Sequence, residues 1–214
     1  MSTARQETRA NYDRLSRWYD LISGSSERPA RTRGMDMLDI QPGERVLEIG
    51  CGTGEALSVL AARAGPSGQA IGFDLSSGML GMAQSKLGRL PLSNITLIQG
   101  DSALLPFAKE TFNVVFMGFT LELFDNSEVP VVLEECSRVL RPGGRLGIVS
   151  LLEKDRPGVV EALYAWAHLR WPSVIDCHPI RLFTVLQESG LATRETSEQS
   201  LWGLRVGIAI AQPM

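Results

Sequence analysis

A short apolar run and a set of alternating glycines meet at residues 45–54, which read Arg-Val-Leu-Glu-Ile-Gly-Cys-Gly-Thr-Gly. The apolar half predicts a buried strand, and the glycine half predicts a loop that tolerates positive φ and lets a ligand lie against the backbone. From Glu55 onward the apolar spacing becomes that of a helix. A strand, a glycine loop and a helix in this order bind nucleotide-like ligands at the carboxyl edge of a parallel sheet.

The same alternation of strand and helix patterns continues along the chain. Further strands are expected at residues 70–73, 95–98, 114–118 and 145–151, and further helices at about 76–88 and 127–140. The segment Arg-Pro-Gly-Gly at 141–144 predicts a tight turn into the strand at 145. Strict alternation implies parallel strands joined by right-handed crossovers, so the predicted fold is a doubly wound α/β sheet with helices on both faces.

The last third of the chain is less regular. Helices are expected at 161–170 and 181–189, with a loop at 171–179 between them. Two final strands at 193–200 and 204–211 are expected to pair as an antiparallel hairpin. With 214 residues, 44% of them hydrophobic, and no repeat or flexible linker, the chain is expected to form one domain.

Two Tyr-Asp pairs stand out near the N-terminus. Tyr12-Asp13 and Tyr19-Asp20 lie seven residues apart, about two helical turns, so both pairs share one face of a predicted helix. One interpretation is an amphipathic helix packed on the domain, and the other is a lid that carries aromatic rings to a binding site. The segment Ser-Gly-Ser-Ser at 23–26, followed by Pro29, is expected to end this helix.

Charge and composition narrow the class of partner. The net charge of −3 and a pI near 5.5 argue against a nucleic-acid binder, which needs a basic excess, so a small molecule is the expected partner. Three cysteines without a Cys-x-x-Cys pair suit a reducing cytoplasm. No signal peptide is expected at the polar N-terminus, and no apolar stretch reaches the roughly 20 residues of a membrane span. The oligomeric state stays open, with a homodimer as one alternative.

Two acidic residues end predicted strands beside the glycine loop. Asp74 lies 20 residues past Gly54, the distance at which a βαβ unit places its second strand next to the loop. A carboxylate there can accept hydrogen bonds from both hydroxyls of a ribose. Asp101 ends the next strand and lies at the same edge. A capping or turn acid is the alternative for Asp74, and an Asx turn is the alternative for Asp101.

The loop departs from the dinucleotide fingerprint G-x-G-x-x-G. The first two glycines are Gly50 and Gly52, but the third position holds Glu55, where close helix packing requires a small residue. Glu48, two residues before the first glycine, would repel a pyrophosphate but could support a ligand with ammonium or sulfonium charge. Both departures disfavour an NAD-linked oxidoreductase and favour a cationic adenosine derivative.

With these motifs the sequence resembles the class I S-adenosylmethionine-dependent methyltransferases, and among them the small-molecule group near the ubiquinone and menaquinone methyltransferases. The resemblance covers roughly residues 10–150. Its five motifs are the paired Tyr-Asp of 12–20, Val-Leu-Glu-Ile-Gly-Cys-Gly-Thr-Gly at 46–54, Gly-Phe-Asp-Leu-Ser at 72–76, Gly-Asp-Ser-Ala-Leu-Leu-Pro-Phe at 100–107 and Arg-Val-Leu-Arg-Pro-Gly-Gly at 138–144.

The resemblance implies a Rossmann-like seven-stranded sheet in the order 3-2-1-4-5-7-6 with strand 7 antiparallel. It divides the single domain, 1–214, into an N-terminal helical lid at 1–40, a cofactor-binding core at 41–150, and substrate-side helices with the final hairpin at 151–214.

The resemblance also implies a role for each matched residue in binding S-adenosylmethionine. Glu48 would organise the methionyl end, and Asp74 would hold the ribose diol. Gly50, Cys51 and Gly52 would let the cofactor approach the backbone. The other implied positions are Leu75 and Met79 flanking the adenine, Asp101 and Ser102 at the adenine edge, Gly118 to Thr120 along the passage to the reactive methyl group, and Tyr12 and Tyr19 in the lid.

Methyl transfer from a sulfonium has a neutral leaving group, S-adenosylhomocysteine. The protein therefore mainly supplies position and a dry site, and it needs a base only where the acceptor loses a proton. His178 and Tyr19 are the candidate catalytic residues, and His168 is a weaker one. Asp176 and Cys177 adjoin His178, but adjacent residues rarely converge on one ion, so no metal is expected.

The methyl acceptor is the most open part of the prediction. Four aromatic residues of the last third favour a hydrophobic acceptor, such as a quinone, a phenol or a lipid-like molecule methylated on carbon or oxygen, unless they are core residues. They are Trp166, Trp171, Phe183 and Trp202. One alternative is a catalytically silent cofactor-binding scaffold or sensor. Another is a nucleic-acid methyltransferase, disfavoured because Thr-Leu-Glu-Leu at 120–123 replaces an Asn-Pro-Pro-Tyr-like segment.

Overall fold

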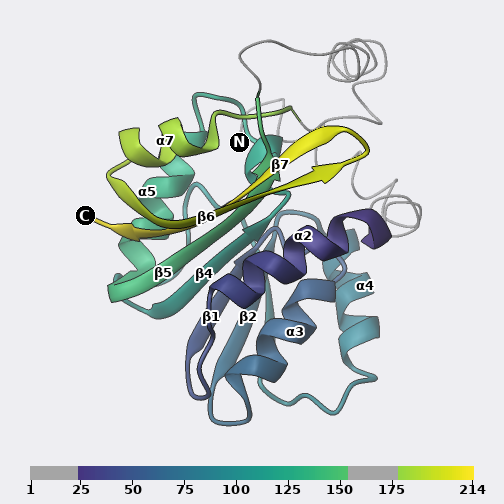
Figure 1. Cartoon of the computed structure of the whole chain (residues 1–214). Coiled ribbons are helices and arrows are strands. Elements are labelled where there is room, and N and C mark those ends of the chain that lie inside the picture. The colour runs from purple at the N-terminus through teal and green to yellow at the C-terminus, as the bar shows by residue number, and fades with distance from the viewer. Residues whose placement is uncertain (1–23, 154–177) are drawn as a thin grey trace.

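The computed structural model describes residues 24–153 and 178–214, which build one seven-stranded sheet (Figure 1). The strands are β1 (Arg45–Ile49), β2 (Gln69–Asp74), β3 (Ile95–Gln99), β4 (Phe112–Gly118), β5 (Leu140–Leu151), β6 (Leu191–Leu201) and β7 (Leu204–Pro213). Their order is β3-β2-β1-β4-β5-β7-β6. The first five are parallel, and β7 pairs antiparallel with both β5 and β6. The predicted strand order and the antiparallel final hairpin are confirmed.

Helices cover both faces of the sheet (Figure 1). They are α2 (Gly24–Met37), α3 (Glu55–Ala64), α4 (Ser77–Leu87), the 3-10 helix η1 (Leu121–Leu123), α5 (Val129–Val139) and α7 (Leu182–Glu188). Helices α2, α3 and α4 pack on one face, and α5 and α7 pack on the other. Within the described ranges, none of the helices combines the length and the apolar character that a membrane crossing requires.

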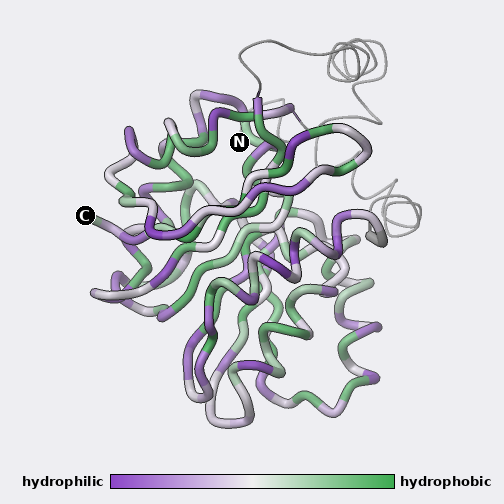
Figure 2. The backbone as a smooth tube through the Cα atoms, viewed as in Figure 1, coloured by the Kyte–Doolittle hydropathy of each residue, from purple (hydrophilic) through white to green (hydrophobic). Residues whose placement is uncertain are grey.

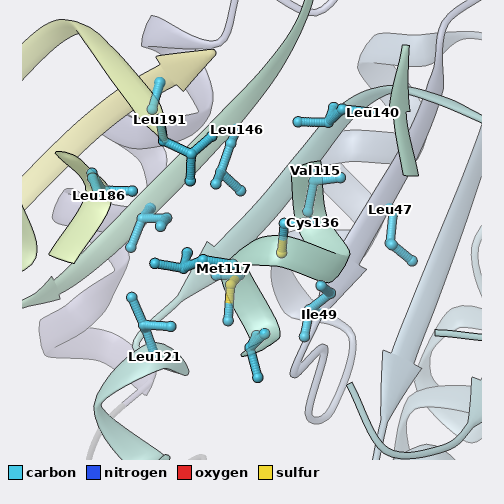
Figure 3. Packing of buried hydrophobic residues seen from close by; sticks show 14 of the residues in the cluster. Leu47, Ile49, Val115, Met117, Leu121, Cys136, Leu140, Leu146, Leu186 and Leu191 are labelled. Atoms are coloured by element: carbon cyan, nitrogen blue, oxygen red, sulfur yellow. The ribbon is translucent and has the colours of Figure 1, made fainter. Parts of the chain in front are cut away.

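The strands separate these two layers because successive side chains point to opposite faces. Val46 and Phe116 pack with α2 and α3, whereas Leu47 and Met117 pack with α5. Figure 3 shows the second layer, in which Cys136 of α5 lies among the strand residues. The inner strands are therefore apolar on both faces, as their colour in Figure 2 shows, and the sheet is rigid enough to fix the loops at its carboxyl edge.

Helix α2 corrects one prediction. Residues 24–29, expected to break the helical pattern, are themselves helical, because α2 runs from Gly24 through Pro29 to Met37, whereas the helix expected before them lies outside the described residues. Pro29 lacks the N–H that would bond to the main-chain oxygen of Ser25, and its ring crowds that oxygen. Packing offsets that loss: a Cβ on Gly34 would lie 2.6 Å from Val149 Cγ2, so the helix backbone lies directly on the sheet.

Strand β5 corrects a second prediction, the tight turn at 141–144. The strand begins at Leu140, pairs there with Phe112, and resumes pairing at Arg145 opposite Val114. The residues between form an irregular bulge with positive φ at Gly143. A Pro-Gly-Gly sequence thus produced a bulge within a strand, because both ends of the segment found partners on β4.

Several predicted features lie outside the described residues. They are Tyr12, Tyr19, the helix at 161–170, and the weaker candidates His168, Asp176 and Cys177. The helix expected at 181–189 is confirmed as α7, and the hairpin turn between β6 and β7 consists of Trp202 and Gly203.

Candidate active site

The glycine loop leaves β1 at the carboxyl edge of the sheet. The main-chain nitrogens of Gly50 and Cys51 donate to the oxygen of Phe73 at 2.8 and 3.2 Å, which fixes the loop beside the end of β2. Gly50 and Gly52 have φ of 69° and 51°, values that favour glycine. A Cβ on Gly50 would overlap the side chain of Thr120, whereas a Cβ on Gly52 would meet nothing within 4 Å. The loop therefore presents bare backbone to open space at Gly52.

Asp74 ends β2 and organises this loop. One carboxylate oxygen accepts a 2.8 Å hydrogen bond from the nitrogen of Gly52, and the other accepts a 2.9 Å bond from the nitrogen of Ser76. The main-chain oxygen of Asp74 also accepts from the nitrogen of Gly100, which brings the end of β3 alongside. The predicted acid thus lies where the ends of β1, β2 and β3 meet.

The residues expected around an adenine follow β2 and β3. Ser76 caps α4 by accepting a 3.1 Å bond from the nitrogen of Met79, which buries Met79 in the first turn and leaves Leu75 half-buried before it. A carboxylate oxygen of Asp101 accepts a 3.0 Å bond from the nitrogen of Ala103. This bond forms the Asx turn that was the alternative role for Asp101. Ser102 is buried beside it. The structure brings these residues to one edge, and their contacts with adenine stay predictions.

The chain after β4 crosses above the glycine loop. Thr120 is buried and its side chain lies against Gly50, so the chain after β4 packs directly on the glycine loop. Phe119, between Gly118 and Thr120, is buried with φ of 57°, a conformation that is costly for a bulky residue. Strain of this kind is typical of functional sites, and no sequence pattern indicated it. The predicted passage residues therefore lie next to the predicted backbone cradle.

Glu48 and Arg31 form the charged centre of the site. Glu48 is 4% exposed, and its Oε2 has no hydrogen-bond partner among the described residues. Burial raises the pKa of Glu48 well above its usual range, Arg31 lowers it, and Asp74 and Glu55 raise it. Arg31, from α2, also lies close to Gly118, whose added Cβ would be 3.2 Å from Arg31 Cδ. A buried carboxyl and a guanidinium from different elements thus meet beside the glycine loop.

Helix α2 is attached to the site through ion pairs with Glu55. Arg31 Nη2 lies 3.1 Å from one oxygen of Glu55, and Arg28 Nε donates to the other at 2.8 Å. Glu27 lies 4.0 Å from Arg31, and its pKa is raised to about 7 because burial outweighs Arg31, with Glu55 adding to the rise. Glu55, which breaks the dinucleotide fingerprint, therefore anchors a helix over the loop.

Three residues that the sequence interpretation missed belong to this edge: Glu27, Arg31 and Glu122. Glu27 and Arg31 have the i,i+4 spacing of a helical ion pair, a usable signal that the expected helix end at Pro29 obscured. Glu122 lies in η1 and is fully buried. Its environment depends on β5, so local sequence held no signal for it.

Cys51 and His178, two residues with reactive side chains, differ in their surroundings. Cys51 is buried with its sulfur packed toward Gly72, and burial raises its pKa, so its thiol stays protonated and its main chain serves the loop. His178 is half-buried, and its main-chain nitrogen donates to the main-chain oxygen of Glu122 at 3.2 Å. His178 therefore lies beside the chain after β4, on the side of β5.

These residues fit S-adenosylmethionine. The unsatisfied Oε2 of Glu48 offers an acceptor for an ammonium group, and Arg31 offers a donor for a carboxylate. The open space over Gly52 admits a ligand against the backbone. A pyrophosphate would instead meet three acids, Glu48, Glu55 and Asp74. The charge arrangement matches an amino-acid zwitterion joined to a nucleoside.

Comparisons with known proteins indicate a methyltransferase. Residues 46–144 match the model of a methyltransferase domain. The demethylmenaquinone methyltransferase of Bacillus cereus (strain B4264) is 33% identical over 153 residues, which cover 70% of this chain and 62% of the relative. The chain thus spans less than two thirds of the length of this curated relative.

Two solved structures share the fold at low identity. A SAM dependent methyltransferase from Aquifex aeolicus is 22% identical, with a TM-score of 0.63 and coverage of 85% of this chain and 88% of that one. The [4+2]-cyclase SpnF is 17% identical, with a TM-score of 0.78 and coverage of 99% and 97%. Since the domain match includes the glycine loop and the sheet has the predicted order, residues 46–144 form a methyltransferase domain, and the chain has the fold of S-adenosylmethionine-dependent methyltransferases.

Proposed function

We propose that this protein transfers a methyl group from S-adenosylmethionine to a carbon or oxygen atom of a small hydrophobic acceptor, with a reduced naphthoquinone as the favoured class. The observation that carries the cofactor half is the buried, unsatisfied oxygen of Glu48 beside Arg31 at the glycine loop. The acceptor half is supported by the 33% identity to a demethylmenaquinone methyltransferase.

Three side chains hold the cofactor in this proposal. Glu48 accepts hydrogen bonds from the methionyl ammonium, and Arg31 donates to the methionyl carboxylate. Asp74 accepts from the ribose hydroxyls while its hydrogen bond to Gly52 keeps the loop in shape. Since Glu48 has a raised pKa, a cationic ligand binds to its ionised form and displaces a proton.

The chain contributes position and proton removal to the reaction. When bound, the cofactor supplies an electrophilic methyl group on a sulfonium and leaves as a neutral thioether. A quinol acceptor becomes a better nucleophile as its hydroxyl proton leaves, and His178 takes that proton. Tyr19, outside the described residues, stays the second candidate, with Tyr12 beside it in the predicted lid. Thr120 and Phe119, both buried, keep water away from the passage.

Calorimetry with S-adenosylmethionine and S-adenosylhomocysteine tests the cofactor half. Saturable binding of both compounds is expected. Binding of S-adenosylmethionine should also displace a proton from Glu48, which is measured as a dependence of the binding enthalpy on the ionisation enthalpy of the buffer. Absence of binding by either compound would contradict the proposal.

Transfer of a labelled methyl group to a short-chain demethylmenaquinol tests the acceptor half. Mass spectrometry of the extracted quinone should show one added methyl group, and the oxidised quinone, kept free of reductant, should gain none because its ring is electron-poor. Tight cofactor binding without transfer to the quinol, to phenols or to a lipid extract would instead favour a cofactor-binding scaffold or sensor.

The same proposal places the protein in the reducing cytoplasm. The two cysteines that the structure describes, Cys51 and Cys136, are buried free thiols. Labelling of thiols in freshly lysed cells, with and without prior reduction, checks this: a disulfide in the native protein would contradict it.

A further inference from the structure

Glu122 joins the chain after β4 to the end of β5. It lies in η1, three residues beyond the predicted passage residue Phe119, and its side chain is fully buried. Ser150 Oγ donates to one carboxyl oxygen at 2.8 Å, and the nitrogen of Leu151 donates to the other at 3.2 Å. The carboxyl group therefore spans the carboxyl edge between two parallel strands.

The main chain of Glu122 holds a third segment in place. Its oxygen accepts the 3.2 Å hydrogen bond from the nitrogen of His178. Two residues later, the nitrogen of Ile180 donates to the oxygen of Leu151 at 3.0 Å. The segment that carries His178 thus runs along the end of β5, and Glu122 contacts both through different atoms.

The charges around Glu122 make its protonation state sensitive to pH. The donors from β5 are neutral, and the charged group that acts on the carboxyl from α2 is Glu27, an acid. Burial raises the pKa of Glu122 to about 7, its hydrogen bonds lower it, and Glu27 raises it. The Ser150 hydroxyl can donate to the carboxylate or accept from the protonated acid, so the connection persists in both states.

We propose that Glu122 is a positioning residue of the acceptor side, which holds the His178 segment against β5 and places a titratable charge beside it. This inference rests on the proposed function in one respect, the assignment of His178 to the acceptor side. Glu122 acts through its neighbours, since its own oxygens are engaged by Ser150 and Leu151.

Amide NMR of the full chain tests the inference without an acceptor. The Leu151 amide proton, bonded to the carboxyl, should shift with a midpoint near pH 7. Glu122→Gln should abolish that step, and Glu27→Gln should move it to lower pH because a repelling charge is gone. The exposed α5 residue provides the control: Glu134→Gln should leave the step unchanged. A Leu151 step that persists in Glu122→Gln would overturn the inference.

Hydrogen exchange and kinetics test the positioning itself. In Glu122→Ala the His178 amide should exchange at least tenfold faster, whereas S-adenosylhomocysteine affinity should stay within twofold of wild type. With the demethylmenaquinol probe, the KM for the acceptor should rise at least fivefold in the same variant. Glu122→Gln should match wild type at pH 6, where the native side chain is protonated, and differ at pH 8.

The outcomes separate the two proposals. Wild-type protein that methylates no quinol refutes the proposed acceptor but leaves the exchange and amide measurements valid. Unchanged His178 exchange in Glu122→Ala refutes the positioning role, whatever the acceptor. Loss of cofactor affinity together with acceptor affinity in both variants would also overturn it, because that result indicates general loss of structure.

Discussion

The nitrogen of Gly52 donates a 2.8 Å hydrogen bond to the carboxylate of Asp74, which links the glycine loop after β1 to the end of β2. One residue that would bind the ribose therefore also shapes the loop that would admit the methionyl group. A substitution at this position changes both functions, and the type of side chain decides how far each is lost.

Asp74→Asn should weaken S-adenosylhomocysteine binding by about 10-fold and Asp74→Ala by about 100-fold or more. The amide keeps one acceptor oxygen for Gly52 or the ribose, whereas alanine keeps none, and each charged hydrogen bond contributes about 1.5–3 kcal/mol. Calorimetry measures both values. Equal affinities for wild type and Asp74→Ala would show that this carboxylate does not contact the ribose.

Gly50→Ala and Gly52→Ala should fail in different ways. Both place alanine at positive φ, which costs about 1–2 kcal/mol. At Gly50 the methyl group also overlaps Thr120, so about 1–3 kcal/mol more should be lost in urea unfolding. At Gly52 the methyl group enters open space, so the fold should persist while cofactor affinity falls at least 10-fold.

The contrast between the two alanine variants is the control. If Gly52→Ala binds S-adenosylhomocysteine as wild type does, the open space above Gly52 is not where the cofactor lies. If Gly50→Ala is as stable as Gly52→Ala, the contact with Thr120 has no energetic weight.

Arg31→Leu should reduce cofactor affinity by about 10- to 100-fold, whereas Arg28→Leu should change it by less than twofold. Both arginines pair with Glu55 from the same helix, but Arg31 is 17% exposed and lowers the pKa of Glu48, while Arg28 is 69% exposed. Loss of Arg31 should also raise the pKa of Glu48 further. Calorimetry on both variants checks this, and equal losses would assign the effect to the shared partner Glu55.

Local patterns were sufficient to predict the parallel strands, the final hairpin and the glycine loop. Alternation of apolar residues, the glycines at 50–54 and the 20-residue distance to Asp74 act within single βαβ units. These features are local in sequence, and the resemblance added the order of the seven strands.

The charged centre could not be predicted in the same way. Arg31 reaches Glu55 across 24 residues, and Glu122 reaches Ser150 across 28. Both contacts depend on where α2 and β5 lie on the sheet, and the close approach of α2 depends on the missing side chain of Gly34. Pro29 usually indicates a break in a helix, and Pro-Gly-Gly usually indicates a tight turn. Tertiary packing overrode both local preferences.

Raising the pH from 5 to 8 should destabilise the wild type relative to Glu122→Gln. The folded pKa of Glu122 is about 7 against an ordinary 4.5, so the folded state binds more protons between these values. The contribution of Glu122 to the free energy of unfolding is therefore fully present below about pH 4.5. It is lost as the pH rises through 7, a loss of about 3 kcal/mol.

Urea unfolding at several pH values measures this difference. Glutamine does not titrate, so its free energy of unfolding should change less across the window. Glu134→Gln, on the exposed surface of α5, should follow the wild-type curve. Parallel curves for wild type and Glu122→Gln would contradict the raised pKa.

Trp202→Asn should stabilise the protein by about 0.5–1 kcal/mol, because asparagine tolerates a left-handed backbone better than other residues with a side chain. Trp202 has φ of 51° and Gly203 has φ of 88°, and they form the two-residue turn between the paired Leu201 and Leu204. Trp202 is 70% exposed, so its removal loses little burial. Urea unfolding should show a higher midpoint for Trp202→Asn than for Trp202→Ala, and equal midpoints would mean that backbone strain at this turn contributes nothing.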